Sequence, residues 1–203
     1  VSLIPSSAGI LATGDITVLS GTVKGVGGKE GDVSAGVRSL NGSITVSGGS
    51  LEGVGGSMTL GMSYGLLANN DVILTGGAVK GVGGNEADAS VGVCADAGDI
   101  AITGGTVLAK SGTAPTTCAF DKQPGFGTND TWYRWRTGAG GGYTVSSATE
   151  QYVWDASDTY VEIRPVESPI PKTGDTAMPY LWAGLMLLAG AGLVVLRRRR
   201  RIE

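Results

Sequence analysis

The 203-residue chain contains no histidine, only two cysteines and few aromatic residues, and only 16% of its residues are charged. Its formal net charge is −3, so it lacks the basic surface that nucleic-acid binding requires. We therefore expect no nucleic-acid partner. The absence of histidine, a frequent general base, also weighs against an active site.

Glycine is abundant instead, with 36 residues, and it takes part in a repeat. Four apolar triplets recur with a 28-residue period, at residues 16–18, 44–46, 72–74 and 100–102. The same spacing relates Gly21, Gly49, Gly77 and Gly105. A further apolar segment recurs at residues 35–37, 64–66 and 91–93, where the second copy slips by one residue. A turn tolerates such a slip, whereas a strand would turn its side chains over.

The apolar positions alternate with Thr, Ser and Lys, and Gly, Asn and Asp separate the segments, which indicates short strands joined by corners. Propeller blades need roughly 40 or more residues, so a β-helix coil fits the 28-residue period better. We predict an all-β fold with a right-handed parallel β-helix over residues 1–121. Further coils are expected upstream, because residues 8–11 match the second half of a coil.

Two charged series follow the repeat. Lys24, Glu52 and Lys80 occupy equivalent positions, so coil stacking would place opposite charges side by side. The second series is acidic and consists of Asp15, Asp71, Asp99, Glu30, Asp32, Glu86 and Asp88. Its carboxylates are a possible calcium site, because Ca²⁺ takes several oxygen ligands. Alternatively, they make side-chain bonds to the backbone of the turns and stay solvated.

Cys94 and Cys118 do not have the spacing of a metal site. The offset between Asp96 and Asp121 aligns Cys118 with Val93, which brings the two cysteines to neighbouring coils at adjacent positions. A disulfide is permitted outside the cell, but alternating side-chain directions would separate the sulfurs. We favour two apolar thiols in or near the core.

The composition changes at Phe120, since residues 120–160 contain nine aromatic residues. We predict an aromatic β cap over residues 122–164 that covers the last coil. Strand alternation in residues 132–136 places Trp132, Arg134 and Arg136 on one face of the strand. Tyr133 and Trp135 lie on the other face. The alternative to a compact cap is an exposed platform for a sugar ring, with arginines as planar donors. The candidate platform residues are Trp132, Arg134, Trp135, Arg136 and Trp154.

The end of the chain differs from the rest. Residues 165–173 form a short extended linker that ends in a sequence motif described below. A tail over residues 174–203 follows. The tail has an apolar run at residues 180–196 and five arginines at residues 197–201. A helix over the run reaches about 25 Å, near the lower limit for spanning a hydrocarbon core. We predict a single hydrophobic helix with its arginines on the cytoplasmic side.

This arrangement resembles the Gram-positive cell-wall sorting signal, Leu-Pro-x-Thr-Gly followed by a hydrophobic segment and a basic tail. The matching residues are Ile170, Pro171, Lys172, Thr173 and Gly174, with isoleucine where leucine is usual. The resemblance implies that a sortase cuts between Thr173 and Gly174 and joins the threonine carbonyl to a peptidoglycan precursor. The product would be a secreted protein, covalently anchored in the cell wall after a transient plasma-membrane stage. An ordinary single-pass membrane anchor is the alternative.

Two expectations follow from this resemblance. The sequence begins at Val1 without a methionine or a charged-then-apolar leader, and we expect a signal peptide upstream, because a sorting signal serves only an exported protein. Cleavage after Thr173 would remove the five arginines, Asp175 and Glu203, which leaves 10 basic and 16 acidic residues and a net charge of −6. An acidic product disfavours polyanions unless a cation bridges them, and permits neutral glycans, basic proteins and divalent cations.

The glycine-rich repeats resemble parallel β-helix domains of Firmicutes surface adhesins and carbohydrate-binding proteins, some of which bind acidic polysaccharides through calcium. The resemblance implies an adhesin or a glycan-binding protein. A structural stalk that displays upstream domains is the second hypothesis. A carbohydrate-active enzyme is the third, because this architecture also serves lyases and hydrolases. We expect no enzyme, since the repeats contain a single arginine, Arg38, and their carboxylates have no evident partner.

Overall fold

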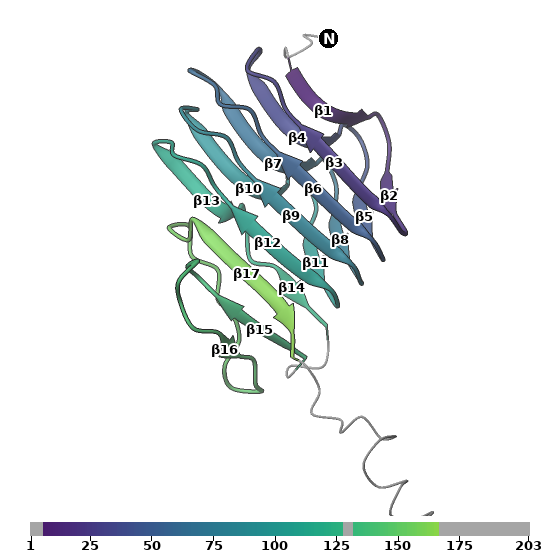
Figure 1. The fold of residues 1–203 in the computed structure, drawn as a ribbon, viewed down its shortest axis with the longest axis vertical. Helices are drawn as coiled ribbons and strands as arrows, with labels where there is room; N and C mark the ends of the chain where they lie inside the picture. The colour runs from purple at the N-terminus through teal and green to yellow at the C-terminus, as the bar shows by residue number, and fades with distance from the viewer. Residues whose placement is uncertain (1–5, 128–131, 167–203) are drawn as a thin grey trace, which may run out of the picture. The chain divides into compact units, whose positions relative to one another are not determined.

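The computed structural model describes residues 6–127 and 132–166, which contain strands and no helix. Val1–Val166 form one compact unit. The coils stack on one another, and their strands form three sheets that run along the solenoid. The stack extends from β1 at one end to the cap strands β15, β16 and β17 at the other (Figure 1). The predicted all-β parallel solenoid is confirmed.

Each of the first four coils contributes one strand to each sheet. The first sheet consists of β1 (Ser6–Ala12), β4 (Val33–Ser39), β7 (Met62–Ala68), β10 (Ala89–Ala95) and β13 (Thr116–Phe120). The second consists of β2 (Ile16–Val18), β5 (Ile44–Val46), β8 (Val72–Leu74), β11 (Ile100–Ile102) and β14 (Gly125–Phe126). The third consists of β3 (Thr22–Val26), β6 (Ser50–Val54), β9 (Ala78–Val82), β12 (Thr106–Lys110), β17 (Tyr160–Pro165), β15 (Tyr133–Arg136) and β16 (Thr144–Val145).

The registers confirm the repeat and its slip. Ile16 pairs with Ile44, one full repeat later, whereas Val33 pairs with Met62 and Met62 pairs with Ala89. The extra residue of the second unit lies in the turn between β6 and β7, and the turn between β7 and β8 is one residue shorter in compensation. The slip is therefore confined to turns and turns no strand over.

The spaced glycines shape the turn before the third sheet. Gly21, Gly49, Gly77 and Gly105 have φ angles of 77°, 69°, 74° and 79°. This left-handed conformation costs glycine little, because it has no Cβ. The regular spacing of these glycines thus reports one turn that recurs in successive coils.

The inner space is divided by a close approach of the first and third sheets. A Cβ atom added to Gly53 would lie 2.2 Å from the Gly65 carbonyl oxygen, and one added to Gly65 would lie 2.2 Å from the Val82 nitrogen. On one side of this contact lies the apolar core, where Val37, Ile44, Leu51 and Leu66 are fully buried. Glycine is required here because the backbones of two sheets touch.

On the other side of the contact is a column of buried serines. Ser34, Ser63 and Ser90 are fully buried on the inner face of the first sheet. The Ser63 hydroxyl donates to the Gly56 carbonyl at 2.8 Å and accepts from the Gly84 amide at 2.9 Å. Ser34 makes the same pair of bonds one coil earlier. Each hydroxyl thus joins two neighbouring coils, which satisfies polar groups that burial would otherwise penalise.

The predicted charge series on the third sheet is confirmed. Lys24 pairs with Glu52, and Glu52 pairs with Lys80, in the registers β3 with β6 and β6 with β9. The Lys24 Nζ lies 3.1 Å from Glu52 Oε2, and the Lys80 Nζ lies 2.8 Å from Glu52 Oε1. The hydrogen bonds from Lys80 and Lys24 lower the pKa of Glu52. Exposed pairs of this kind stabilise weakly, so their main value is in fixing the register.

The cap continues the third sheet. Strand β17 runs antiparallel to β12, and β15 runs antiparallel to β17. The cap places Tyr133, Tyr152 and Trp135 in the same core as the last coil. The Phe126 and Tyr133 rings stack with centroids 4.2 Å apart. An aromatic cap therefore covers the end of the solenoid, whereas a domain boundary at residue 121 stays a prediction.

The cysteines require one correction. Cys118 pairs with Val91 rather than Val93, because Asp121 bonds Ala95 and does not take the place of Asp96. Both thiols are free. Cys94 is buried in a small apolar cluster and Cys118 packs against it, which agrees with the apolar interpretation.

No helix within residues 6–127 and 132–166 is long and apolar enough to cross a membrane. The predicted helix over residues 180–196, the sorting motif and most of the linker lie outside the described residues.

Candidate binding site

A groove of about 580 Å³ opens along one corner of the solenoid. Its lining repeats with the coil. The ends of β6, β9 and β12 contribute Val54, Val82 and Lys110, which pair in successive registers. The following turns contribute Ser57, Asn85 and Thr113, which are again spaced by one repeat. Thr117, Thr159 and Tyr160 line the groove near the cap.

Inter-coil hydrogen bonds hold the turns that line this groove. The Asn85 side-chain oxygen accepts from the Thr113 amide at 2.9 Å. The Ser90 hydroxyl accepts from the Gly112 amide at 2.7 Å. The Ser111 amide donates to the Thr159 carbonyl at 3.0 Å, which ties the last turn to the cap. The groove is therefore preformed on regular backbone.

The polar side chains that line the groove carry hydroxyl, amide, ammonium and phenol groups. Thr113 and Lys110 are exposed, and Tyr160 is half-buried. Among the described residues, no carboxylate lines the groove. Sequence reasoning missed this groove. The polar residues at 57, 85 and 113 were visible as a regular series, but nothing in their identity showed that the corner is concave.

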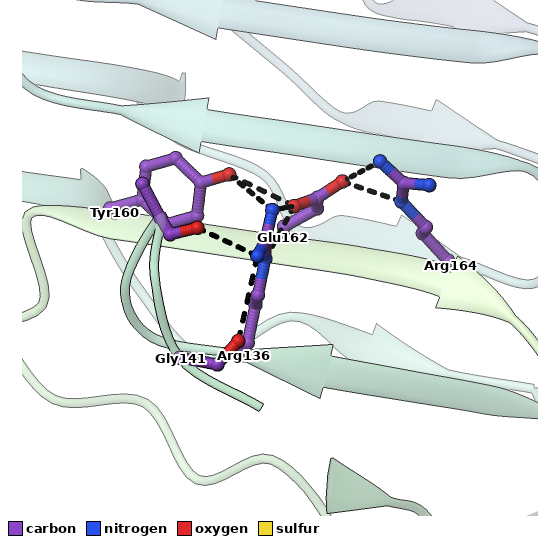
Figure 2. Close-up of polar contacts among 6 residues, drawn as sticks. Arg136, Gly141, Tyr160, Glu162 and Arg164 are labelled. Atoms are coloured by element: carbon purple, nitrogen blue, oxygen red, sulfur yellow. Dashed lines mark hydrogen bonds and ion pairs between the residues drawn. The ribbon is translucent and has the colours of Figure 1, made fainter. Parts of the chain in front are cut away.

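Beside the groove, on the outer face of the same sheet, Glu162 is only 4% exposed and lies among cations and phenols (Figure 2). Its Oε2 accepts from Arg136 Nε at 2.7 Å and from the Tyr160 hydroxyl at 2.9 Å. Its Oε1 accepts from Arg164 Nε at 2.5 Å. Arg136 also donates to the Ala139 carbonyl at 2.7 Å, which holds the glycine-rich turn.

This network fixes the charge of Glu162. Burial alone would raise the pKa of its carboxyl group, but hydrogen bonds from Arg136, Tyr160 and Arg164 outweigh burial. The pKa falls to about 2. Glu162 is therefore an anion at any physiological pH and joins β15 to β17.

The predicted alternation in residues 132–136 is confirmed, but the aromatic platform is not assembled as an exposed surface. Tyr133 and Trp135 are buried, and Trp135 belongs to the core. Trp132 and Trp154 are half-buried and pack against that core. The indole Nε1 of Trp154 donates to the Phe120 carbonyl at 2.8 Å. Trp135 is thus a core residue of the cap, whereas Arg134 and Arg136 lie on the outer face.

Three of the seven carboxylates in the acidic series, those of Asp15, Asp71 and Asp88, make inter-coil bonds. Asp15 Oδ1 accepts from the Ser43 amide at 2.8 Å, the Ser43 hydroxyl accepts from the Asp71 amide, and Asp71 Oδ1 accepts from the Asp99 amide at 2.8 Å. Asp88 Oδ2 accepts from the Gly61 amide at 2.7 Å. This matches the turn interpretation, except that each bond crosses to another coil.

Asp99 contributes only its amide to these bonds, and it is exposed, as are Glu30, Asp32 and Glu86. In the ranges that the structure describes, no three carboxylate or cysteine side chains gather closely enough to hold a metal ion. Calcium binding by these residues stays a prediction.

Comparison with known proteins identifies a cell-wall anchor at the end of the chain. Residues 170–203 match the family described as LPXTG cell wall anchor motif. No curated protein and no solved structure matches the chain. The anchor implies processing by a sortase and attachment to peptidoglycan. The chain is therefore a secreted, cell-wall-anchored surface protein that carries a β-solenoid.

Proposed function

We propose that this wall-anchored protein is an adhesin of the glycan-binding kind, and that the corner groove is its ligand site. The observation that carries the proposal is the repetition of the groove lining along the solenoid axis. Ser57, Asn85 and Thr113 recur at the coil repeat, which is about 4.8 Å in a parallel sheet. A linear polymer presents the same groups at regular intervals, so it can satisfy such a series.

The chemistry of the lining supports a sugar ligand. Hydroxyl and amide side chains donate and accept hydrogen bonds, as sugar hydroxyls do. Tyr160 lines the groove near the cap, and aromatic side chains pack against the C–H groups of sugar rings. The groove is held by side-chain and backbone hydrogen bonds between its turns, so binding orders little of the protein.

We further propose binding without catalysis. Glycoside hydrolysis generally uses a pair of carboxylates that flank the scissile bond. The side chains that line the described groove are Ser, Thr, Asn, Lys, Tyr and small apolar residues. They can hold a polysaccharide, but they include no acid and base pair for its cleavage.

A glycan array tests this proposal. The full protein, released from the wall by a wall-digesting enzyme, is applied with and without calcium. Thr113→Val removes an exposed hydroxyl from the groove at nearly constant volume. Thr17→Val makes the same change on an exposed site of β2, outside the groove. We expect binding to a linear glycan that falls several-fold in Thr113→Val and is unchanged in Thr17→Val.

The calcium arm tests the acidic series separately, since only metal-dependent binding supports a role for it. Equal loss in both threonine variants, or no loss in either, contradicts the groove as the ligand site.

A structural stalk is the second candidate. The inter-coil hydrogen bonds of Ser34, Ser63 and Asp71 favour it, because they stiffen the solenoid along its axis. A spacer needs no ligand of its own. Silence of the protein on the array, with and without calcium, supports this role instead.

A further inference from the structure

Two arginines face each other across the cap. Arg134 on β15 pairs with Arg164 on β17 in the antiparallel register. Both side chains lie on the outer face, since the alternating Tyr133, Trp135 and Ile163 are buried. Like charges directly opposite each other on a sheet are destabilising. The pair therefore needs negative charge nearby.

A third guanidinium and a tyrosine complete this cluster. The Arg134 and Arg136 guanidinium carbons each lie 4.9 Å from the centroid of the Tyr143 ring, and that of Arg164 lies 5.7 Å away. Three guanidinium cations thus surround the Tyr143 ring. Cation–π attraction to one aromatic ring offsets only part of the repulsion among them.

The carboxylate beside this cluster, that of Glu162, already forms ion pairs with two of the three arginines. Among the described residues, Glu162 is the one carboxylate with an ion pair to these arginines, and it pairs with Arg136 and Arg164. Within the same ranges Arg134 makes no such pair, and its buried Nε has no hydrogen-bond acceptor. Three guanidiniums against one carboxylate leave two positive charges in excess. A buried donor without an acceptor adds a further cost.

We propose that this cluster of Arg134, Arg164 and Tyr143 is an oxyanion-binding site on the outer face of the cap. The oxyanion accepts hydrogen bonds from the terminal nitrogens of Arg134 and from Arg164, whose side chain is 47% exposed. Planar guanidiniums match the geometry of carboxylate and phosphate groups. Glu162 offsets the charge of Arg164 only in part, because it also pairs with Arg136, and the ligand relieves the repulsion that remains between Arg134 and Arg164.

The site stands out against the rest of the protein. The whole chain carries a net charge of −3, so a local excess of positive charge is not a general property of its surface. The proposal is independent of the groove, because none of Arg134, Arg164 and Tyr143 lines it.

Two sources carry the required oxyanion: the carboxylate of an acidic polysaccharide and the phosphate of a polyol-phosphate polymer. Titration of the full, wall-released protein with polygalacturonate, polyglycerol phosphate and inorganic phosphate distinguishes them. Neutral glucan serves as the uncharged probe. We expect affinity for at least one of the anionic probes, none for the glucan at this site, and weaker binding at higher salt.

Arg134→Gln is the decisive variant, since Arg134 makes no ion pair with any described residue. Loss of a charge-assisted hydrogen bond predicts a reduction in affinity of about tenfold or more. Lys29→Gln makes the same change of net charge at an exposed position in the turn between β3 and β4 and should bind as the parent does.

Thermal stability gives a second readout. Without anion, Arg134→Gln should melt at or above the temperature of the parent, because repulsion is relieved. With anion, the parent should gain stability and the variant should not. Equal affinity of the parent and Arg134→Gln overturns the proposal. So does equal loss in Lys29→Gln, or the absence of binding to every anionic probe. None of these outcomes bears on the neutral-glycan result for Thr113→Val.

Discussion

Arg136 and Glu162 lie opposite each other on β15 and β17, and the Arg136 Nε donates to the Glu162 carboxylate at 2.7 Å. The contact joins the strand nearest the solenoid to the outer hairpin of the cap. Since Glu162 is almost fully buried, this bond is protected from competition with water. The stability of the cap should therefore depend on this one carboxylate.

The first prediction is that Glu162→Gln destabilises the protein by about 2–3 kcal/mol, because charge-assisted bonds are lost and two arginines lose their counter-charge. Urea denaturation followed by tryptophan fluorescence measures the change, since Trp132, Trp135 and Trp154 lie in the cap. Glu150→Gln removes an exposed carboxylate and should change stability by less than about 0.5 kcal/mol. Equal effects of the two variants would contradict the network.

The second prediction concerns acid. Folding lowers the pKa of Glu162 from its ordinary 4.5 to about 2, so the folded state holds this carboxylate ionised where the unfolded state protonates it. Its contribution is complete above pH 4.5 and is lost as the pH falls towards 2. The stability difference between the parent and Glu162→Gln should shrink over that window. A difference that is constant from neutral pH to pH 2 would exclude this role.

The third prediction addresses the contact between the first and third sheets. Gly53→Ala places a Cβ atom 2.2 Å from the Gly65 carbonyl oxygen, and neither backbone can move without breaking its ladder. We expect a loss of about 3 kcal/mol, or failure to fold. Gly14→Ala is the matched control, because no atom lies within 4 Å of its added Cβ. Thermal melting of both proteins compares them, and a Gly53→Ala protein as stable as Gly14→Ala would refute the contact.

The fourth prediction tests the anchor. Thr173→Ala should abolish covalent attachment, so that the protein keeps its basic tail and detergent extracts it. Thr176→Ala, just outside the motif, should remain in the fraction released by wall-digesting enzymes. Immunoblots of the two fractions, with the mass of the product, report the outcome. Wall-released Thr173→Ala of the same mass as the parent would mean that another bond holds the protein.

Much of the fold was visible in the sequence. The period of the repeat, the slip at residues 64–66 and the pairing of Lys24 with Glu52 all follow from side chains that recur along the chain. These features are local or periodic, so one sequence contains them. The cell-wall anchor could also be predicted from the sequence, because its residues are contiguous.

The rest depends on three-dimensional packing. Ser63 resembles a solvated strand residue, and only the close approach of two sheets makes it an inner hydrogen-bond donor. Trp135 alternates as predicted, but its burial depends on Tyr133 and Tyr152, which come from different parts of the cap. Cys118 was misaligned because Asp121 resembles Asp96 in sequence but not in position. The groove likewise arises from the curvature of a corner.

The column of buried serines has an evolutionary consequence. The hydroxyls of Ser34 and Ser63 each bond the turn before their own strand and the equivalent turn of the next coil, so these two units offer the same groups. Duplication or loss of one whole unit in the gene would therefore leave every hydroxyl in the column satisfied. Lineages could lengthen or shorten the displayed domain by recombination, without compensating substitutions in its interior.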